Sequence, residues 1–254
     1  MKKKNLLIFV VILCVLSSCA SSSKVKGSRL YDCSGRLTEA IEKYQKKRYS
    51  LAQEQFSEIL SKCPGHSSND TTFYFLGKCW LALKKPDDAK LEFDRLSQTF
   101  PNSPFSEEAR YLVGLTSFLA SSPWYLDQTS TLEARNRLRE YIELNQGSPF
   151  ADSARIYVGK CNDKLAEKEY QTARFYEKTN HYESAIVYHK NVINEYPESP
   201  FVQQSKLAVA EDLIELSRNT EAIAVLDQLL GESKDDAIVR KAGALKQKAA
   251  KKQL

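Results

Sequence analysis

The sequence predicts an all-α protein, a solenoid of about five helix hairpins, and three observations lead to this fold class. One helical pattern occurs three times with identical spacing: Ala52-Phe56-Ile59-Pro64, Ala89-Phe93-Leu96-Pro101 and Ala185-His189-Val192-Pro197. Three helices are expected to begin at the same tripeptide, Ser-Pro-Phe. No stretch shows the alternation of apolar and polar residues that is typical of a strand. Because one hairpin cannot bury its own apolar face, such repeats stack on one another.

Residues 1–18 are predicted to be a signal peptide, and Cys19 is predicted to carry lipid. Three lysines precede an unbroken apolar run from Leu6 to Leu16, which is shorter than the roughly 20 residues that span a bilayer. Leu16-Ser17-Ser18-Cys19 follows the lipobox of bacterial lipoproteins, whose diacylglyceryl and N-acyl chains anchor a protein firmly. An ordinary secretory signal is the alternative. In bacterial lipoproteins an Asp directly after the lipidated cysteine favours retention in the inner membrane, and here that residue is Ala20. We therefore expect the protein to be anchored in the outer membrane and to face the periplasm.

The composition of the rest of the chain indicates its domain organisation and excludes one class of partner. Residues 19–30 are small and polar without periodicity, so we expect a flexible tether; residues 31–233 are the predicted solenoid, and residues 234–254 a basic helix or tail. The formal net charge is +5, and three of the positive charges are lysines of the signal peptide. The remainder is therefore nearly neutral, which argues against nucleic acid as a partner. We interpret the basic tail as a solvated helix face rather than a site for anionic lipid.

Four cysteines remain beyond the lipid anchor. Cys33 precedes the first predicted hairpin and Cys63 ends it, so the hairpin brings them together, and an oxidising compartment allows a disulfide between them. Cys79 and Cys161 lie on apolar helical faces, where a buried thiol is a small hydrophobe. The cysteine spacing fits no metal-site pattern, and no metal site is predicted.

The repeated pattern resembles the tetratricopeptide repeat, in which a small residue and an aromatic of the first helix pack against an alanine and an aromatic of the second. The match is strongest in the second unit, with Gly77, Trp80, Ala89, Phe93 and Pro101. The fourth unit fits almost as well, and a fifth lacks the closing proline. This resemblance implies a right-handed α-solenoid.

The third unit departs from the pattern, because Gly114 and Ala134 lie 20 residues apart instead of 12. We interpret residues 121–128 as an inserted surface loop, with Ser130 and Glu133 as a capping box that restarts the helix. The serines of the three Ser-Pro-Phe motifs, Ser103, Ser148 and Ser199, are expected to be helix N-caps with proline at the first helical position. A continuous helix is expected from about Phe150 to Lys178.

The sequence carries no catalytic signature, neither a Gly-rich phosphate loop nor His-Glu-x-x-His nor Gly-x-Ser-x-Gly, and no enzyme activity is predicted. His189 occupies the slot of Phe56 and Phe93, so packing is its expected role. His66 and His181 lie in predicted turns.

Binding is the remaining use of this scaffold. The residues at groove-facing positions of the tetratricopeptide pattern are Tyr44, Tyr74, Lys78, Tyr111 and Phe118. Such a groove suits an extended peptide that ends in an aromatic residue and a carboxylate. The alternative is that these rings only pack between neighbouring helices. Trp124 and Tyr125 lie in the inserted loop, which is either an exposed contact patch for a partner or folded back onto the solenoid.

From Cys19 to about Gly231, the chain resembles the BamD (YfiO or ComL) family of outer-membrane protein assembly lipoproteins. The specific similarity lies in Tyr49 to Ala52, in residues 125–129 and in residues 164–176, which match the helix before the family's fourth repeat. The resemblance implies a subunit of the β-barrel assembly machinery. Its first repeats would receive C-terminal segments of unfolded outer-membrane proteins, and residues of about 150–230 would hold the periplasmic domains of the barrel subunit BamA. No cofactor is expected beyond the lipid on Cys19.

The sequence is also compatible with two other functions. Another periplasmic tetratricopeptide lipoprotein, such as a coordinator of cell-wall synthesis or envelope constriction, has similar repeats but usually a coiled coil, and no sustained heptad occurs here. A peptidoglycan-acting enzyme with appended repeats would need a catalytic domain.

Overall fold

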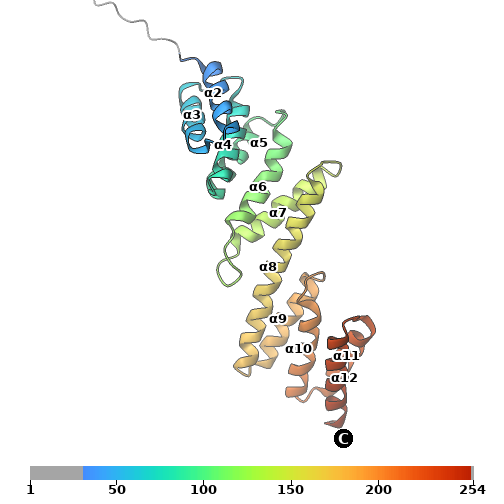
Figure 1. Cartoon of the computed structure of the whole chain (residues 1–254). Helices are drawn as coiled ribbons and strands as arrows, with labels where there is room; N and C mark the ends of the chain where they lie inside the picture. The colour runs from blue at the N-terminus through green and yellow to red at the C-terminus, as the bar shows by residue number, and fades with distance from the viewer. Residues whose placement is uncertain (1–30, 253–254) are drawn as a thin grey trace, which may run out of the picture. The chain divides into compact units, whose positions relative to one another are not determined.

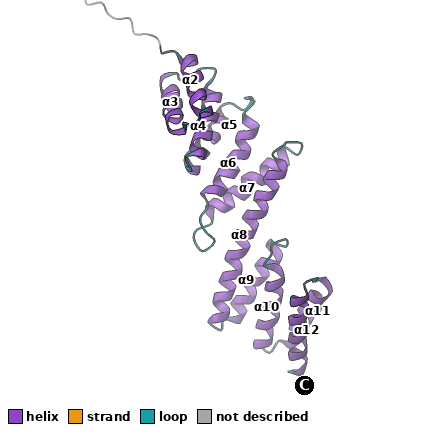
Figure 2. Cartoon of the chain, viewed as in Figure 1, coloured by secondary structure: helices purple, strands orange, loops and turns teal. Residues whose placement is uncertain are grey.

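The structure, a computed structural model, describes residues 31–252, which contain eleven helices and no strand (Figures 1 and 2). The predicted signal peptide, Cys19 and the tether lie outside these residues. From Cys33 onward the chain forms one compact unit. Each helix packs on the next along the chain. The helices are α2 Cys33–Gln45, α3 Tyr49–Lys62, α4 Asn69–Ala82, α5 Pro86–Thr99, α6 Ser106–Ala120, α7 Thr129–Leu144, α8 Ala151–Lys178, α9 Tyr182–Glu195, α10 Val202–Glu215, α11 Asn219–Glu232 and α12 Asp236–Lys251.

The turn inside four of the five hairpins uses the same backbone device. Lys47, Lys84, Asn180 and Ser217 have φ between 58° and 61°, the left-handed conformation that commonly ends a helix. The next residue then donates its N–H to a carbonyl five positions back, as Lys85 does to Trp80 at 2.9 Å. Only the third hairpin, between α6 and α7, replaces this turn with the loop of residues 121–128.

The two helices of the second hairpin approach closely because Gly77 has no side chain. A Cβ placed at Gly77 would lie 2.6 to 2.9 Å from three ring atoms of Phe93, whose side chain is fully buried. Gly114 meets Leu138 in the same way in the third hairpin, at 2.7 Å. The predicted pairing of a small residue with a large apolar one is therefore confirmed.

We expect Gly77→Ala to destabilise the protein by about 1 to 3 kcal/mol, because the added methyl overpacks a core that cannot shift. Gly159→Ala is the matched control: Gly159 lies inside α8 with nothing within 4 Å of an added Cβ, so alanine should stabilise by about 0.5 to 1 kcal/mol. Urea unfolding followed by circular dichroism measures both. Equal effects of the two substitutions would contradict the close approach at Gly77.

Stacked aromatic rings join successive hairpins. The ring of Tyr74 stacks on that of Phe105 at 4.4 Å between centroids; Tyr111 stacks on Phe150 at 5.2 Å, and Tyr170 on Phe201 at 5.1 Å. In each pair the phenylalanine is the last residue of a Ser-Pro-Phe motif. The motif therefore supplies the ring on which the preceding hairpin rests, a role that the sequence did not indicate.

The prediction of Ser103, Ser148 and Ser199 as helix N-caps is wrong in detail. Regular helix starts three residues later, at Ser106, Ala151 and Val202. Each serine instead closes a tight turn ahead of the helix, since its hydroxyl accepts the N–H two residues on, as Ser103 does from Phe105 at 3.2 Å. The ring is thereby fixed just before the helix begins.

The third hairpin carries the predicted loop and the predicted long helix follows it, but the capping box is wrong. Helix α7 begins at Thr129, one residue before Ser130, and its N-cap position is Gln128. Glu133 turns away from the helix start to pair with Lys90 of α5, at 2.9 Å. Helix α8 runs without a break from Ala151 to Lys178, as expected.

The basic C-terminal segment is a helix that belongs to the compact unit. Helix α12 packs on α10 and α11 and buries Ala242 and Ala249. Its lysines pair with acidic residues of those helices: Lys241 with Glu211, Lys246 with Asp227 and Lys248 with Glu215. The segment is therefore a closing helix for the array. Among the described helices, none combines the length and apolar character that crossing a membrane requires.

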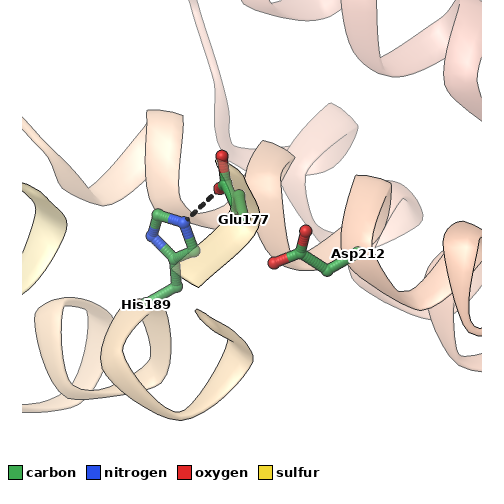
Figure 3. Close-up of side chains that lie close together, drawn as sticks. All are labelled: Glu177, His189 and Asp212. Atoms are coloured by element: carbon green, nitrogen blue, oxygen red, sulfur yellow. Dashed lines mark hydrogen bonds and ion pairs between the residues drawn. The ribbon is translucent and has the colours of Figure 1, made fainter. Parts of the chain in front are cut away.

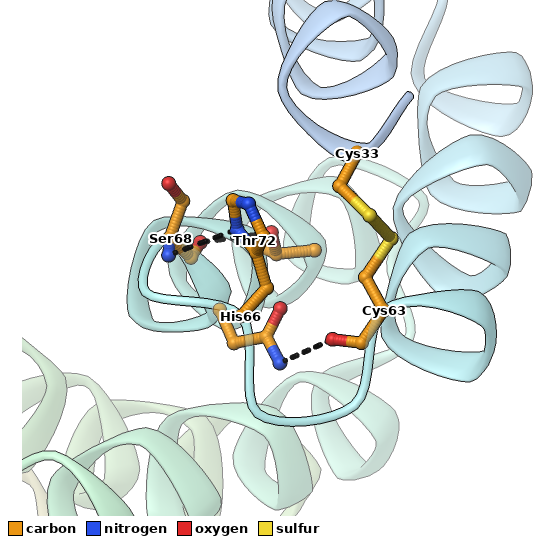
Figure 4. Close-up of a disulfide and its surroundings, with 6 residues drawn as sticks. Cys33, Cys63, His66, Ser68 and Thr72 are labelled. Atoms are coloured by element: carbon orange, nitrogen blue, oxygen red, sulfur yellow. Dashed lines mark hydrogen bonds between the residues drawn. A yellow bond between two sulfur atoms is a disulfide. The ribbon is translucent and has the colours of Figure 1, made fainter. Parts of the chain in front are cut away.

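The predicted bridge between Cys33 and Cys63 is present, with 6.2 Å between the two Cα atoms (Figure 4). It joins the first residue of α2 to the residue that ends α3. Asn69 of α4 donates its side-chain amide to the carbonyl of Cys63 at 3.0 Å, so the bridged hairpin is also tied to its neighbour. Cys79 and Cys161 are buried free thiols, as predicted.

Candidate functional site

Three of the predicted groove residues form one half-buried surface on α2 and α4, which we call the N-terminal aromatic surface: Tyr44, Tyr74 and Lys78. The rings of Tyr44 and Tyr74 both contact Phe75, at 5.2 and 5.3 Å between centroids. The ammonium of Lys78 lies 5.5 Å from the centre of the Tyr74 ring. A cation beside half-exposed aromatic rings suits a ligand with an aromatic side chain and a carboxylate.

Glu108 of α6 occupies the polar side of this surface. One carboxylate oxygen accepts the Tyr74 hydroxyl at 2.9 Å, and the other lies 3.4 Å from the Lys78 ammonium. Burial, together with Glu108, raises the pKa of the Tyr74 hydroxyl, which therefore remains a neutral donor. A half-exposed ion pair of this kind is worth about 0.2 to 1 kcal/mol, so Glu108 holds the Lys78 ammonium only weakly.

Tyr111 does not belong to this surface. Only 6% of it is exposed, its ring stacks on Phe150, and its hydroxyl shares a 2.7 Å hydrogen bond with Ser153 of α8. Its prediction as a groove residue is wrong, and the alternative of packing between hairpins holds for it. Phe118 is half-buried beside the ring of Tyr157 and under the ammonium of Lys164, far along the chain from Tyr44 and Tyr74.

The inserted loop of residues 121–128 is fixed to α8. The Lys164 ammonium donates to the Ser121 hydroxyl at 2.6 Å and to the Ser122 carbonyl at 3.2 Å, and Lys168 donates to the Leu126 carbonyl at 2.9 Å. Trp124 is half-buried with its ring edge-on to Tyr125, whereas Tyr125 and Leu126 are exposed, Tyr125 by 64%. Both readings of the loop are therefore partly correct: it folds back at its base and presents an apolar tip.

A buried polar cluster that the sequence did not indicate joins α8, α9 and α10 (Figure 3). The Nε2 atom of His189 lies 2.8 Å from a carboxylate oxygen of Glu177, and its Nδ1 atom lies 3.2 Å from the Ser205 hydroxyl. Asp212 is 3% exposed, and its Oδ2 atom is buried without a hydrogen-bond partner. His189 does occupy the packing slot that its position predicts, but with polar partners in place of a phenylalanine core.

Comparison with known proteins assigns the family. The model of the YfiO family, described as an outer membrane lipoprotein, matches residues 33–224. The chain belongs to this family. The match begins at α2 and continues through the hairpins described above into α11. This member of the family is a non-enzymatic scaffold of tetratricopeptide-like repeats.

Relatives of the chain in several bacteria are named outer membrane protein assembly factor BamD. Outer membrane protein assembly factor BamD of Caulobacter vibrioides is 22% identical, over 84% of this chain and 70% of the relative. BamD of Neisseria meningitidis serogroup B is 25% identical, over 82% and 83%, and that of Rickettsia prowazekii is 23% identical, over 86% and 87%. Among solved structures, the tetratricopeptide domain of P58(IPK) is 16% identical over 86% of this chain and 58% of that chain, with a TM-score of 0.42.

Proposed function

We propose that this chain is the scaffold lipoprotein of a β-barrel assembly machinery, anchored to the outer membrane by the lipid on Cys19 and facing the periplasm. The observation that carries the proposal is the YfiO family match, which spans four hairpins and enters the fifth. Relatives similar over most of their length are named for the assembly of outer membrane proteins. The scaffold acts by holding its partners, and no bond is made or broken in it.

The N-terminal aromatic surface is the proposed site for the C-terminal segments of unfolded outer-membrane proteins. Tyr44 and Tyr74 would receive an aromatic side chain, and Lys78 would receive the terminal carboxylate in exchange for Glu108. The exposed fraction of the Lys78 side chain, 29%, supports access to its charge. Because hydrogen bonds to charged groups are the stronger ones, the carboxylate would contribute much of the specificity.

Helices α8 to α11 are the proposed contact surface for the periplasmic domains of a BamA-like barrel subunit. Exposed apolar side chains are present there: Ile156 and Phe175 on α8 and Val187 on α9 are each more than half exposed. Phe175 packs on Tyr176, which stacks on Tyr188 at 5.3 Å. Aromatic and aliphatic anchors of this kind carry much of the energy of protein interfaces. The exposed tip of the inserted loop, with Trp124 and Tyr125, is a second proposed contact for a partner.

Binding of a short peptide ending in phenylalanine with a free carboxylate tests the N-terminal surface. We expect Lys78→Gln to weaken binding by about fivefold to tenfold, since it removes roughly 1 kcal/mol of charge-assisted interaction. Glu108→Gln should tighten it, because the competitor for Lys78 is gone. Isothermal titration calorimetry with the lipoprotein in detergent measures both.

Lys90→Gln is the matched control, because Lys90 forms a similar ion pair with Glu133 away from this surface. It should leave affinity unchanged, and a peptide with an amidated C-terminus should bind all variants equally weakly. Equal affinity of the acid and amide peptides for the wild-type protein would refute the proposed carboxylate site.

A further inference from the structure

The geometry points to a buried site for a divalent transition-metal ion, Zn²⁺ by its donor set, held by Glu177, His189 and Asp212. These residues come from three successive helices, α8, α9 and α10. Each offers one ligand atom, and the three atoms lie within 4.8 Å of one another. A tetrahedral ion with bonds of about 2.1 Å places its ligands about 3.4 Å apart, so side-chain rotations that bring the ligand atoms closer by up to about 1.4 Å are sufficient.

Asp212 has a buried carboxylate oxygen that no group in the described residues contacts by a hydrogen bond. Its carboxylate is turned toward Glu177 in Figure 3, and Oδ2 is buried without a hydrogen-bond partner. Asp212 is only 3% exposed and its carboxylate faces that of Glu177, so a negative charge on Asp212 is poorly compensated there. A buried charge is tolerated when it is paired or bound to a metal. A dication at the centre of the cluster would compensate it.

His189 is held as a metal-binding histidine would be. Its Nδ1 atom faces the Ser205 hydroxyl at 3.2 Å, a partner that can either donate or accept. With Nδ1–H donating to Ser205, the Nε2 lone pair points into the cluster toward Glu177. Histidine ligands are usually fixed by such a bond at the second ring nitrogen. A hydrogen bond from His189 to Glu177 without a metal requires the other tautomer, in which Nε2–H donates to Glu177 and Nδ1 accepts the Ser205 hydroxyl. On metal binding the ring proton is exchanged through solvent from Nε2 to Nδ1, and the metal replaces the contact with Glu177.

The charge balance and the donor atoms favour Zn²⁺ over harder cations. Arg174 pairs with the second oxygen of Glu177, so the cluster keeps about one net negative charge when His189 is neutral. Calcium and magnesium prefer shells made of oxygen alone, whereas imidazole with carboxylates suits zinc. His189 is fully buried and the Glu177 side chain is 14% exposed, so the ion would enter from the Glu177 side. Once bound, it would hold α8, α9 and α10 together.

At the positions equivalent to His189 and Asp212, other repeats of this chain have uncharged residues. The position of His189 is Phe56 and Phe93 in the first two hairpins, and the position of Asp212 is Cys79 and Thr116 in the second and third. All four of those residues are buried. The chain therefore offers its own substitutions for a test, His189→Phe and Asp212→Thr, which conserve the local packing.

The test is Zn²⁺ and Co²⁺ binding to the full-length lipoprotein, purified in detergent without a histidine tag. We expect one Zn²⁺ per chain after gel filtration, a rise in the thermal midpoint on adding Zn²⁺, and a visible absorption band of tetrahedral Co²⁺. His189→Phe and Asp212→Thr should each lose the stoichiometric ion and the band while keeping wild-type helicity. His181→Ala, which changes an exposed histidine at the start of α9, should keep both.

Two results would overturn the assignment. One is a wild-type protein that retains no Zn²⁺ and shows no Co²⁺ band, a result that does not depend on how the variants fold. The other is one ion per chain in the wild type and in both cluster variants alike, which would place the ion elsewhere. Because this site is separate from the proposed client surface, neither result bears on peptide binding.

Discussion

Phe93→Ala is expected to destabilise the protein by about 3 to 5 kcal/mol, because it leaves a cavity at a fully buried ring. Phe93 has no exposed surface, lies against Gly77 and belongs to the central apolar cluster with Leu96, Leu112 and Leu138. The cluster is rigid on the Gly77 side, where helix backbone prevents collapse. Urea unfolding monitored by tryptophan fluorescence measures the loss, since Trp80 packs against the same cluster.

Leu91→Ala is the control on the same helix. Leu91 is 52% exposed, so the substitution should change the free energy of unfolding by no more than about 0.5 kcal/mol. Phe93→Leu should also be mild, at less than about 1.5 kcal/mol, because leucine fills the equivalent slot at Leu138. Equal losses for Phe93→Ala and Leu91→Ala would contradict the packing described for α5.

The double substitution Cys33→Ser and Cys63→Ser is expected to cost about 3 to 4 kcal/mol. The bridge closes a loop of 30 residues, and the loss of chain entropy in the unfolded state scales with the logarithm of that length. Among the described helices, the first hairpin packs mainly on α4. We therefore expect the loss to appear mainly as faster amide hydrogen exchange in α2 and α3, while α10 to α12 remain protected.

Reduction provides the matched control for the disulfide. Dithiothreitol should lower the stability of the wild-type protein to that of the double serine variant and should leave the variant unchanged. Destabilisation of the variant by the reductant would show that the effect does not come from the Cys33–Cys63 bridge.

Most of the fold could be predicted from the sequence because the contacts within each hairpin join residues that are close along the chain. Ala89 and Phe93 lie four residues apart on one helix face, and Gly77 lies one helix earlier, so periodicity alone places them in contact. The Cys33–Cys63 bridge followed for the same reason, since one hairpin sets the distance between its ends. The long helix α8 and the inserted loop were likewise visible as departures from a fixed spacing.

What the sequence did not reveal depends on contacts between hairpins. Tyr111 and Tyr74 occupy equivalent positions and both stack on a Ser-Pro-Phe phenylalanine, yet Tyr111 is 6% exposed and Tyr74 is half-buried. Their hydroxyls meet different partners, Ser153 for Tyr111 and Glu108 for Tyr74. The capping box at Ser130 was wrong because α7 begins one residue earlier, at Thr129, and Glu133 pairs with Lys90 of another helix. The cluster of Glu177, His189 and Asp212 combines three helices, and its only local sign was a histidine in an aromatic slot.

If this YfiO-family chain is a scaffold in a β-barrel assembly machinery, it has a barrel subunit as its partner in the membrane. The most direct measurement is mass spectrometry of the proteins that co-purify with the lipoprotein from detergent-solubilised membranes after mild crosslinking. We expect a BamA-like barrel subunit among them, crosslinked through lysines of α8 to α11. Recovery of the lipoprotein from membranes without any such barrel protein would contradict the scaffold role.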